Sequence, residues 1–200
     1  MIGSLLMLGM LASATTAGCP DPDDSQRIDF DESRAAAGFL VRAGALNVRG
    51  DFGRLQGTLR VGRDRSRACV RTELDADSVA VGTDALGAWA RSVDFFDAER
   101  HPRLRFRSEP FDPRVLLRGG RIDGKLTLLG VTRRQQILAQ RARCTQPPAA
   151  VCTVRMRAAL RRSAFGMRAS RGMVGDRVDL VLRFEAPRSA LDLIHDPSRH

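Results

Sequence analysis

Apolar and polar side chains alternate over most of the chain from Arg27 onward. In the segment 104–109, Leu104, Phe106 and Ser108 fall on one face and the intervening arginines on the other. The same two-residue period recurs at 121–129, 135–142, 154–160 and 178–186. Such alternation is typical of strands that have one face in a dry interior and the other in water.

One segment departs from this period. Thr83 is a suitable N-cap, and 84–92 carries Leu86 and Trp89 at helical spacing, which predicts a short helix. A further short strand is predicted at 115–117, before the long alternating run. About eight strands with one helical insertion predict an all-β fold, an antiparallel barrel whose interior has room for one small ligand.

The composition suits one folded domain. The chain has 200 residues, of which 43% are hydrophobic, and this is enough to build a core. The formal net charge is +10, and Lys125 is the only lysine, so the positive charge is almost all arginine. Two interpretations stay open: attraction to anionic lipid, a phosphorylated ligand or nucleic acid, or arginine-rich solvated strand faces. The even spread of arginines along the chain favours the second.

The first residues resemble an export signal. Residues 1–18 carry no charged side chain, and their apolar run is too short to span a bilayer. The segment ends in Thr16 to Cys19 (TAGC), which is similar to a lipobox, so we expect Cys19 to be lipidated and 19–26 to form a polar tether. A simple cleaved signal is the alternative. Either way the expected location is the periplasm or cell envelope, with a membrane surface as partner through the anchor and the basic charge.

Three other cysteines remain. Cys144 and Cys152 bracket a Pro-rich connector, so an oxidising compartment would permit a disulfide between them. Cys69 is left over, and we expect it to be a small buried or edge residue.

Three motifs carry a resemblance to a known family. The first runs from Ser92 to Asp97 (SVDFFD) and on through His101-Pro102 to Ser108. The second runs from Gly124 to Thr132 (GKLTLLGVT), and the third joins Phe165-Gly166-Met167 to 174–186. In this order and spacing they resemble the YceI family of exported bacterial lipocalin-like barrels. The resemblance covers 27–187 and leaves 188–200 as a loose tail.

The resemblance implies a lipid-binding barrel that encloses an isoprenoid, a quinone or a similar long-chain amphiphile such as a fatty lipid, for storage or transport. The implied lining is Phe95, Phe96, Leu104, Phe106, Leu126, Leu128, Met156, Ala158, Met167, Leu180 and Leu182. The alternative is a structural or stress-protective envelope lipoprotein whose barrel is filled by side chains and holds no ligand.

Other classes have little support in the sequence. We expect no catalytic residue and no metal site, because the chain lacks nucleophile-elbow and HExxH motifs and the body holds one histidine, His101. We expect no nucleic-acid partner, because the stacking aromatics of single-strand binders are missing. No cofactor is expected beyond a bound lipid, and the sequence leaves a homodimer open.

Overall fold

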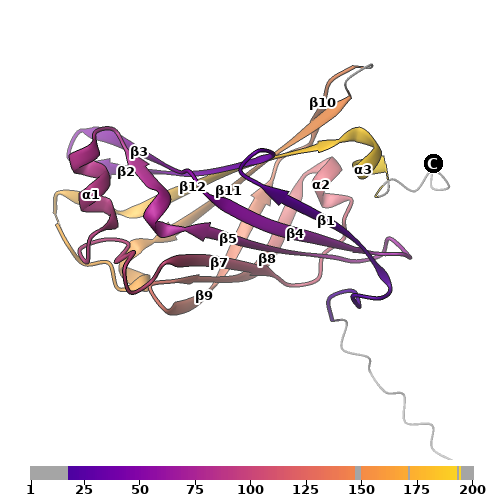
Figure 1. Cartoon of the computed structure of the whole chain (residues 1–200), viewed down its shortest axis with the longest axis horizontal. Helices are drawn as coiled ribbons and strands as arrows, with labels where there is room; N and C mark the ends of the chain where they lie inside the picture. The colour runs from indigo at the N-terminus through magenta and orange to yellow at the C-terminus, as the bar shows by residue number, and fades with distance from the viewer. Residues whose placement is uncertain (1–17, 147–149, 171, 193, 195–200) are drawn as a thin grey trace, which may run out of the picture.

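The computed structural model describes residues 18–146, 150–170, 172–192 and 194. Antiparallel strands form one sheet in the order β1-β4-β5-β7-β8-β9-β11-β12-β2-β3-β6, with β10 paired to β11 beside this path (Figure 1). The strands are β1 (Ser25–Asp31), β2 (Ala35–Ala43), β3 (Leu46–Phe52), β4 (Leu55–Gly62), β5 (Ala68–Asp75), β6 (Val79–Val81), β7 (Arg103–Ser108), β8 (Gly120–Leu128), β9 (Val131–Ala139), β10 (Arg143–Cys144), β11 (Val151–Arg161) and β12 (Val174–Pro187).

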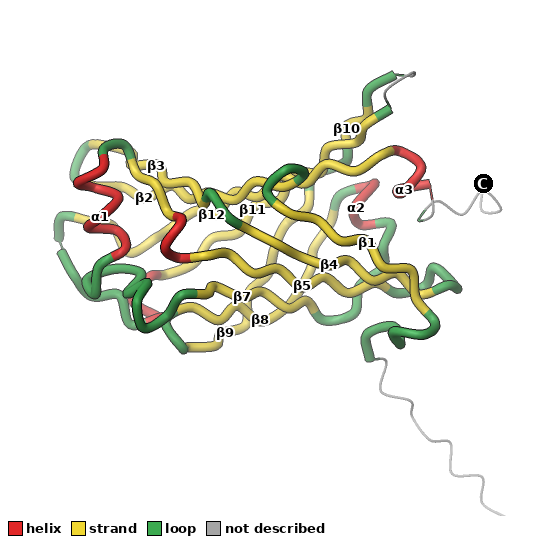
Figure 2. The backbone as a smooth tube through the Cα atoms, in the orientation of Figure 1, coloured by secondary structure: helices red, strands yellow, loops and turns green. Residues whose placement is uncertain are grey.

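The sheet curls into a half-barrel whose two edges approach each other. β6 and β1 are the two edge strands; β3 pairs with β6, and β4 pairs with β1. Only two residues separate β3 from β4 in the chain. In the same way, a three-residue 3-10 turn, η1 (Ala76–Ser78), links β5 to the edge strand β6. Links this short require the two edges to lie close together, as the backbone trace shows (Figure 2). The predicted all-β lipocalin-like fold is therefore confirmed, with more strands than the eight expected.

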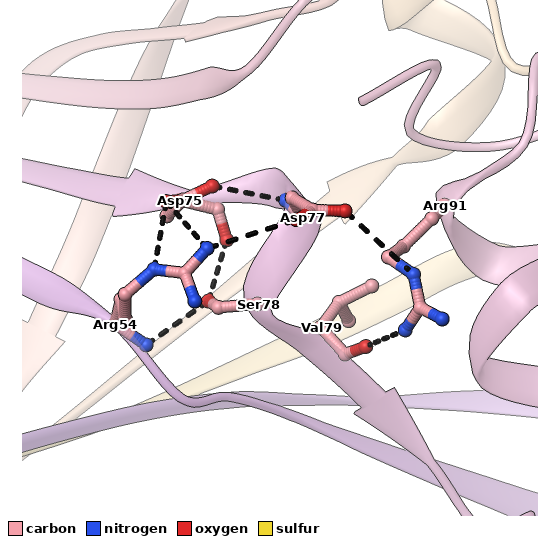
Figure 3. A network of polar contacts seen from close by, with 6 residues as sticks. All are labelled: Arg54, Asp75, Asp77, Ser78, Val79 and Arg91. Atoms are coloured by element: carbon pink, nitrogen blue, oxygen red, sulfur yellow. Dashed lines mark hydrogen bonds and ion pairs between the residues drawn. The ribbon is translucent and has the colours of Figure 1, made fainter. Parts of the chain in front are cut away.

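A polar network holds the junction between these edges (Figure 3). Arg54, in the β3–β4 link, makes an ion pair of 2.9 Å with Asp75, and its amide donates to Ser78 Oγ at 3.0 Å. Arg91 Nη1 donates to the carbonyl of Val79 in β6 at 2.8 Å. These bonds fasten the link, η1 and the helix that bears Arg91 to one another.

Three α-helices accompany the sheet within the described part of the chain. The predicted helix is α1 (Asp84–Arg91), and the hydroxyl of Thr83 caps it by accepting from the Leu86 amide. The strand predicted at 115–117 is wrong, because these residues form α2 (Val115–Arg118). The Asp112 carboxylate accepts from the Arg114 amide, and this turn starts a helix in place of a strand.

The C-terminal segment is not wholly a loose tail. Its first part is α3 (Arg188–Asp192), which lies beside β11 and β12. Leu191 and Ile194 are buried in the hydrophobic core. The predicted signal peptide lies almost wholly outside the described residues.

Two disulfides are present. The expected Cys144–Cys152 bond joins directly paired residues of β10 and β11. The second bond joins Cys19 to Cys69, with 5.6 Å between the Cα atoms. The prediction that Cys19 is lipidated is wrong in this structure, because its sulfur is already bonded to Cys69 and has no thiol to offer. Cys69 is buried, as expected, but it is not a leftover cysteine.

Candidate functional site: an apolar lumen

The interior of the half-barrel contains unfilled space in two compartments. The inner compartment has a cavity volume of about 90 Å³ and lies between β1, β2, β4, β5, β7, β8, β9, β11, β12 and α2. Its walls are mostly aliphatic and aromatic, with Thr72, Arg105, Gln135 and Arg183 as the polar residues.

The outer compartment has a cavity volume of about 190 Å³ and lies at the end that carries α1. Leu86 and Trp89 of α1 line it and are also partly exposed, so they mark its mouth. Arg162 is the one charged side chain among the described residues that line it.

The two compartments are adjacent. Four leucines line both: Leu74 on β5, Leu104 on β7, Leu126 on β8 and Leu180 on β12. The first three lie on neighbouring strands, and β12 belongs to another part of the curled sheet. We call this set the leucine junction. A chain that passes from the mouth to the inner compartment must pass these four side chains.

The structure places nearly all the predicted lining residues at the lumen. Phe106, Met156 and Leu182 line the inner compartment. So do the three junction leucines that the sequence predicted, Leu104, Leu126 and Leu180. Phe95, Phe96, Leu128 and Met167 line the outer one. Ala158 is buried but lines neither compartment. Contact between these residues and a ligand stays a prediction.

Aromatic packing forms one wall near the mouth. The ring of Phe96 packs against Phe39 at 5.7 Å and against Phe52 at 5.6 Å between centroids. Phe95 instead packs edge-on against Trp89 at 4.5 Å. The Phe95–Phe96 pair therefore divides its contacts between β2–β3 and α1.

The comparisons with known proteins agree with this geometry. The model of the YceI-like domain matches residues 28–186. The chain belongs to the YceI family. None of the curated proteins matches it in sequence.

Three solved structures share the YceI fold at low sequence identity. Burkholderia cenocepacia BcnA is 18% identical with a TM-score of 0.64, covering 78% of this chain and 98% of its own. A polyisoprenoid binding domain from Saccharophagus degradans, implicated in plant cell wall breakdown, is 17% identical with a TM-score of 0.56, covering 80% and 98%. The YceI protein of Campylobacter jejuni is 16% identical with a TM-score of 0.55, covering 69% and 83%.

Among the lining residues that the sequence did not predict, Arg162 is the charged residue of the outer compartment. It is 3% exposed, and its guanidinium donates to the carbonyls of Ala169, Val174 and Gly175 at 2.8–3.0 Å. The guanidinium carbon lies 5.8 Å from the centre of the Phe95 ring, a cation–π distance. Arg162 thus ties the β11–β12 connection to the mouth. The inward parity of β11 extends to this position and could have found it.

Ser163, the next residue, binds the same connection from outside. Its amide donates to Asp176 Oδ1 at 2.9 Å. Hydrogen bonds from Ser163 hold the pKa of the Asp176 carboxyl below its usual value. Arg162 and Ser163 therefore both fasten the segment after β11 to the first residues of β12.

Within the ranges that the structure describes, no three His, Cys, Asp or Glu side chains come together in a way that could hold a metal ion. The same residues include no helix long and apolar enough to cross a bilayer.

Proposed function

We propose that this YceI-family protein binds a long-chain lipid, an isoprenoid or a quinone with an isoprenoid tail, inside the half-barrel for storage or transport. The observation that carries the proposal is the pair of adjacent apolar compartments, one at the mouth beside Trp89 and one further inside, which share the leucine junction. The solved relative described as a polyisoprenoid binding domain supports this ligand class.

The physical reason is the cost of leaving such a tail in water. Burial removes about 25 cal/mol per Å² of apolar area from contact with water. The outer compartment supplies a lining that is apolar apart from Arg162, so the tail would lose few favourable polar contacts. The alternative interpretation predicts a barrel filled by side chains, whereas this half-barrel keeps two apolar cavities of about 90 and 190 Å³.

The proposed location is the periplasm. The two disulfides fit an oxidising compartment, in which such bonds form and persist. An export signal in 1–18 would direct the chain there.

The test is native mass spectrometry of the full chain, purified without detergent. We expect a protein species that carries one additional molecule of defined mass, which collisional activation releases as an apolar lipid. After extraction with organic solvent and refolding, the apoprotein should take up farnesol or solanesol from added probe.

A protein that shows only the apo mass, and that binds neither probe after extraction, would contradict the proposal. Uptake of a water-soluble aromatic in preference to both probes would point instead to a different class of ligand.

A further inference from the structure

The end of the molecule that carries the mouth also carries most of the strongly exposed apolar side chains. Met173, Leu46 and Val93 are 72%, 71% and 68% exposed, the three highest values among the exposed large hydrophobic residues described. Leu86 and Trp89 add partly exposed surface beside them. We call these five residues the rim.

The rim residues come from segments far apart in the chain that meet at this end (Figure 1). Leu46 begins β3 after the turn that follows β2, and Met173 precedes β12. The two segments are bonded, because the amide of Gly44 donates to the carbonyl of Met173 at 2.9 Å. Leu86, Trp89 and Val93 lie on α1 and just after it.

The rim is continuous with the lumen. Leu86 and Trp89 line the outer compartment, while Leu46, Val93 and Met173 stand outside it. A ligand that leaves or enters the mouth would therefore cross apolar side chains before it reached water.

We propose that the rim docks on the surface of a lipid bilayer that contains anionic lipid, so that the mouth opens directly toward the membrane. This inference rests on the proposed function for its purpose, since a long apolar tail is transferred with least exposure when cavity and bilayer are in contact. Exposed aliphatic side chains beside a tryptophan are typical of surfaces that insert into the membrane interface.

Charge favours the same partner. The net charge of +10 attracts the chain to an anionic bilayer over distances of about a Debye length. Arg42 and Arg168 are exposed near the rim, although Asp84 and Asp94 are exposed there as well. These four charges offset one another, so the net charge of the whole chain would bring the protein to the membrane and the apolar side chains of the rim would hold it there.

The chain contains its own reporter for this contact. Trp89 is the only tryptophan, there is no tyrosine, and it lies in the rim. We expect its emission to shift to the blue when vesicles of phosphatidylethanolamine and phosphatidylglycerol are added to the full chain. Vesicles of phosphatidylcholine alone should give a weaker shift.

The decisive variant is Leu46→Asp combined with Met173→Asp. Neither residue lines the lumen, and both side chains are already in solvent, so the fold and the bound lipid should be unchanged by thermal melting and native mass spectrometry. Sedimentation with the anionic vesicles should weaken by roughly tenfold or more, because apolar contact is replaced by a carboxylate at the interface.

Leu138→Asp is the matched control. Leu138 is 52% exposed on β9, outside the rim, and its change is combined with Leu40→Asp, at a leucine of β2 that is 40% exposed, so that the control adds the same two charges. It should leave sedimentation within about twofold of the parent, the size of a surface-charge effect.

Equal loss in the rim variant and the control, or no vesicle binding by the parent chain, would overturn the inference. Binding that survives the rim change but disappears in high salt would do so too, since it would be a charge effect alone. These outcomes are separate from a failure of the proposed function, in which the parent chain carries no lipid at all.

Discussion

At the scale of single residues, the leucine junction controls how the lumen can be used. Leu104 is buried on β7 and lines both compartments. Its volume therefore decides whether one long tail can occupy both spaces. We expect a substitution of Leu104 to change which tail lengths the lumen accepts while the mouth stays as it is.

Leu104→Trp should divide the lumen. The larger side chain fills the junction, at a cost in stability of about 1–3 kcal/mol for overpacking. We expect solanesol uptake to fall by roughly tenfold, because its tail loses the inner compartment, while farnesol stays bound in the outer one. Uptake is measured by native mass spectrometry of the delipidated protein.

Leu138→Trp serves as the comparison, since it adds the same ring to an exposed leucine outside the lumen. Equal uptake of both alcohols by Leu104→Trp and the parent would show that the junction does not limit the tail.

Asp75, in the polar network between the two sheet edges, makes the stability of the fold depend on pH. Burial raises its pKa, but the hydrogen bonds from Arg54 and the Asp77 amide, with the charge of Arg54, outweigh this and hold the pKa below the usual 3.8. A carboxyl with a lowered folded-state pKa stabilises the fold above its unfolded-state pKa, and this stabilisation is lost as the pH falls through the folded value.

Asp75→Asn should therefore lower the free energy of unfolding at neutral pH, by about 1 kcal/mol once the exposure of Arg54 is allowed for. It should also flatten the loss of stability below about pH 4. Urea unfolding at several pH values measures both effects. Asp24→Asn is the control, because it removes a carboxylate that is 78% exposed. If Asp24→Asn altered the pH dependence of unfolding as much as Asp75→Asn does, the effect would come from net charge and not from the ion pair between Asp75 and Arg54.

At the scale of elements, the two-residue period predicted the long strands well. β7, β8, β11 and β12 lie where the alternation placed them, and their inward residues line the lumen because parity fixes which face a side chain takes. The helical spacing of Leu86 and Trp89 after Thr83 likewise predicted α1.

Short elements were less predictable for physical reasons. Three apolar residues at Val115–Leu117 fit a strand or a helical turn equally well, and the Asp112 side chain decided for the helix. The sequence near Gly57 also does not indicate that this glycine lies opposite Phe30 in the sheet. An added Cβ at Gly57 would lie 2.2 Å from the Phe30 ring, so this glycine gives an aromatic ring room and does not mark a bend.

The Cys19–Cys69 bond was missed because its partners are 50 residues apart and the lipobox-like motif gave Cys19 another role. Such a long loop should make this the more stabilising of the two disulfides. The chain-entropy relation gives about 4 kcal/mol for it and about 2.5 kcal/mol for Cys144–Cys152, whose separation is 8 residues.

Replacing Cys19 and Cys69 together by serine should therefore lower the midpoint of guanidinium unfolding more than the paired replacement of Cys144 and Cys152. Peptide mapping of the exported protein without reduction should also recover the 19–69 cross-link. A diacylglyceryl group on Cys19 in that map would contradict the pairing.

At the scale of the whole molecule, the unfilled lumen leaves the apoprotein less stable than a solid barrel of equal size. A ligand that binds only the folded state adds about 2.7 kcal/mol at a concentration of 100 times its dissociation constant. For a domain of this size that corresponds to a rise in melting temperature of roughly 5–10 °C.

Delipidated protein should melt lower than protein as purified, and added solanesol should restore the difference. Calorimetry measures the shift. A midpoint that is the same with and without extraction would mean that the space contributes nothing to ligand binding.

The Cys19–Cys69 bond fixes the entry of the polypeptide at one pole of the half-barrel, because Cys69 lies near the start of β5 and the opposite end of that strand leads through η1 toward α1. A fusion partner or affinity handle placed before Gly18 would therefore sit far from the opening. Molecules immobilised on a sensor chip through that handle would all present their openings to the flowing solution.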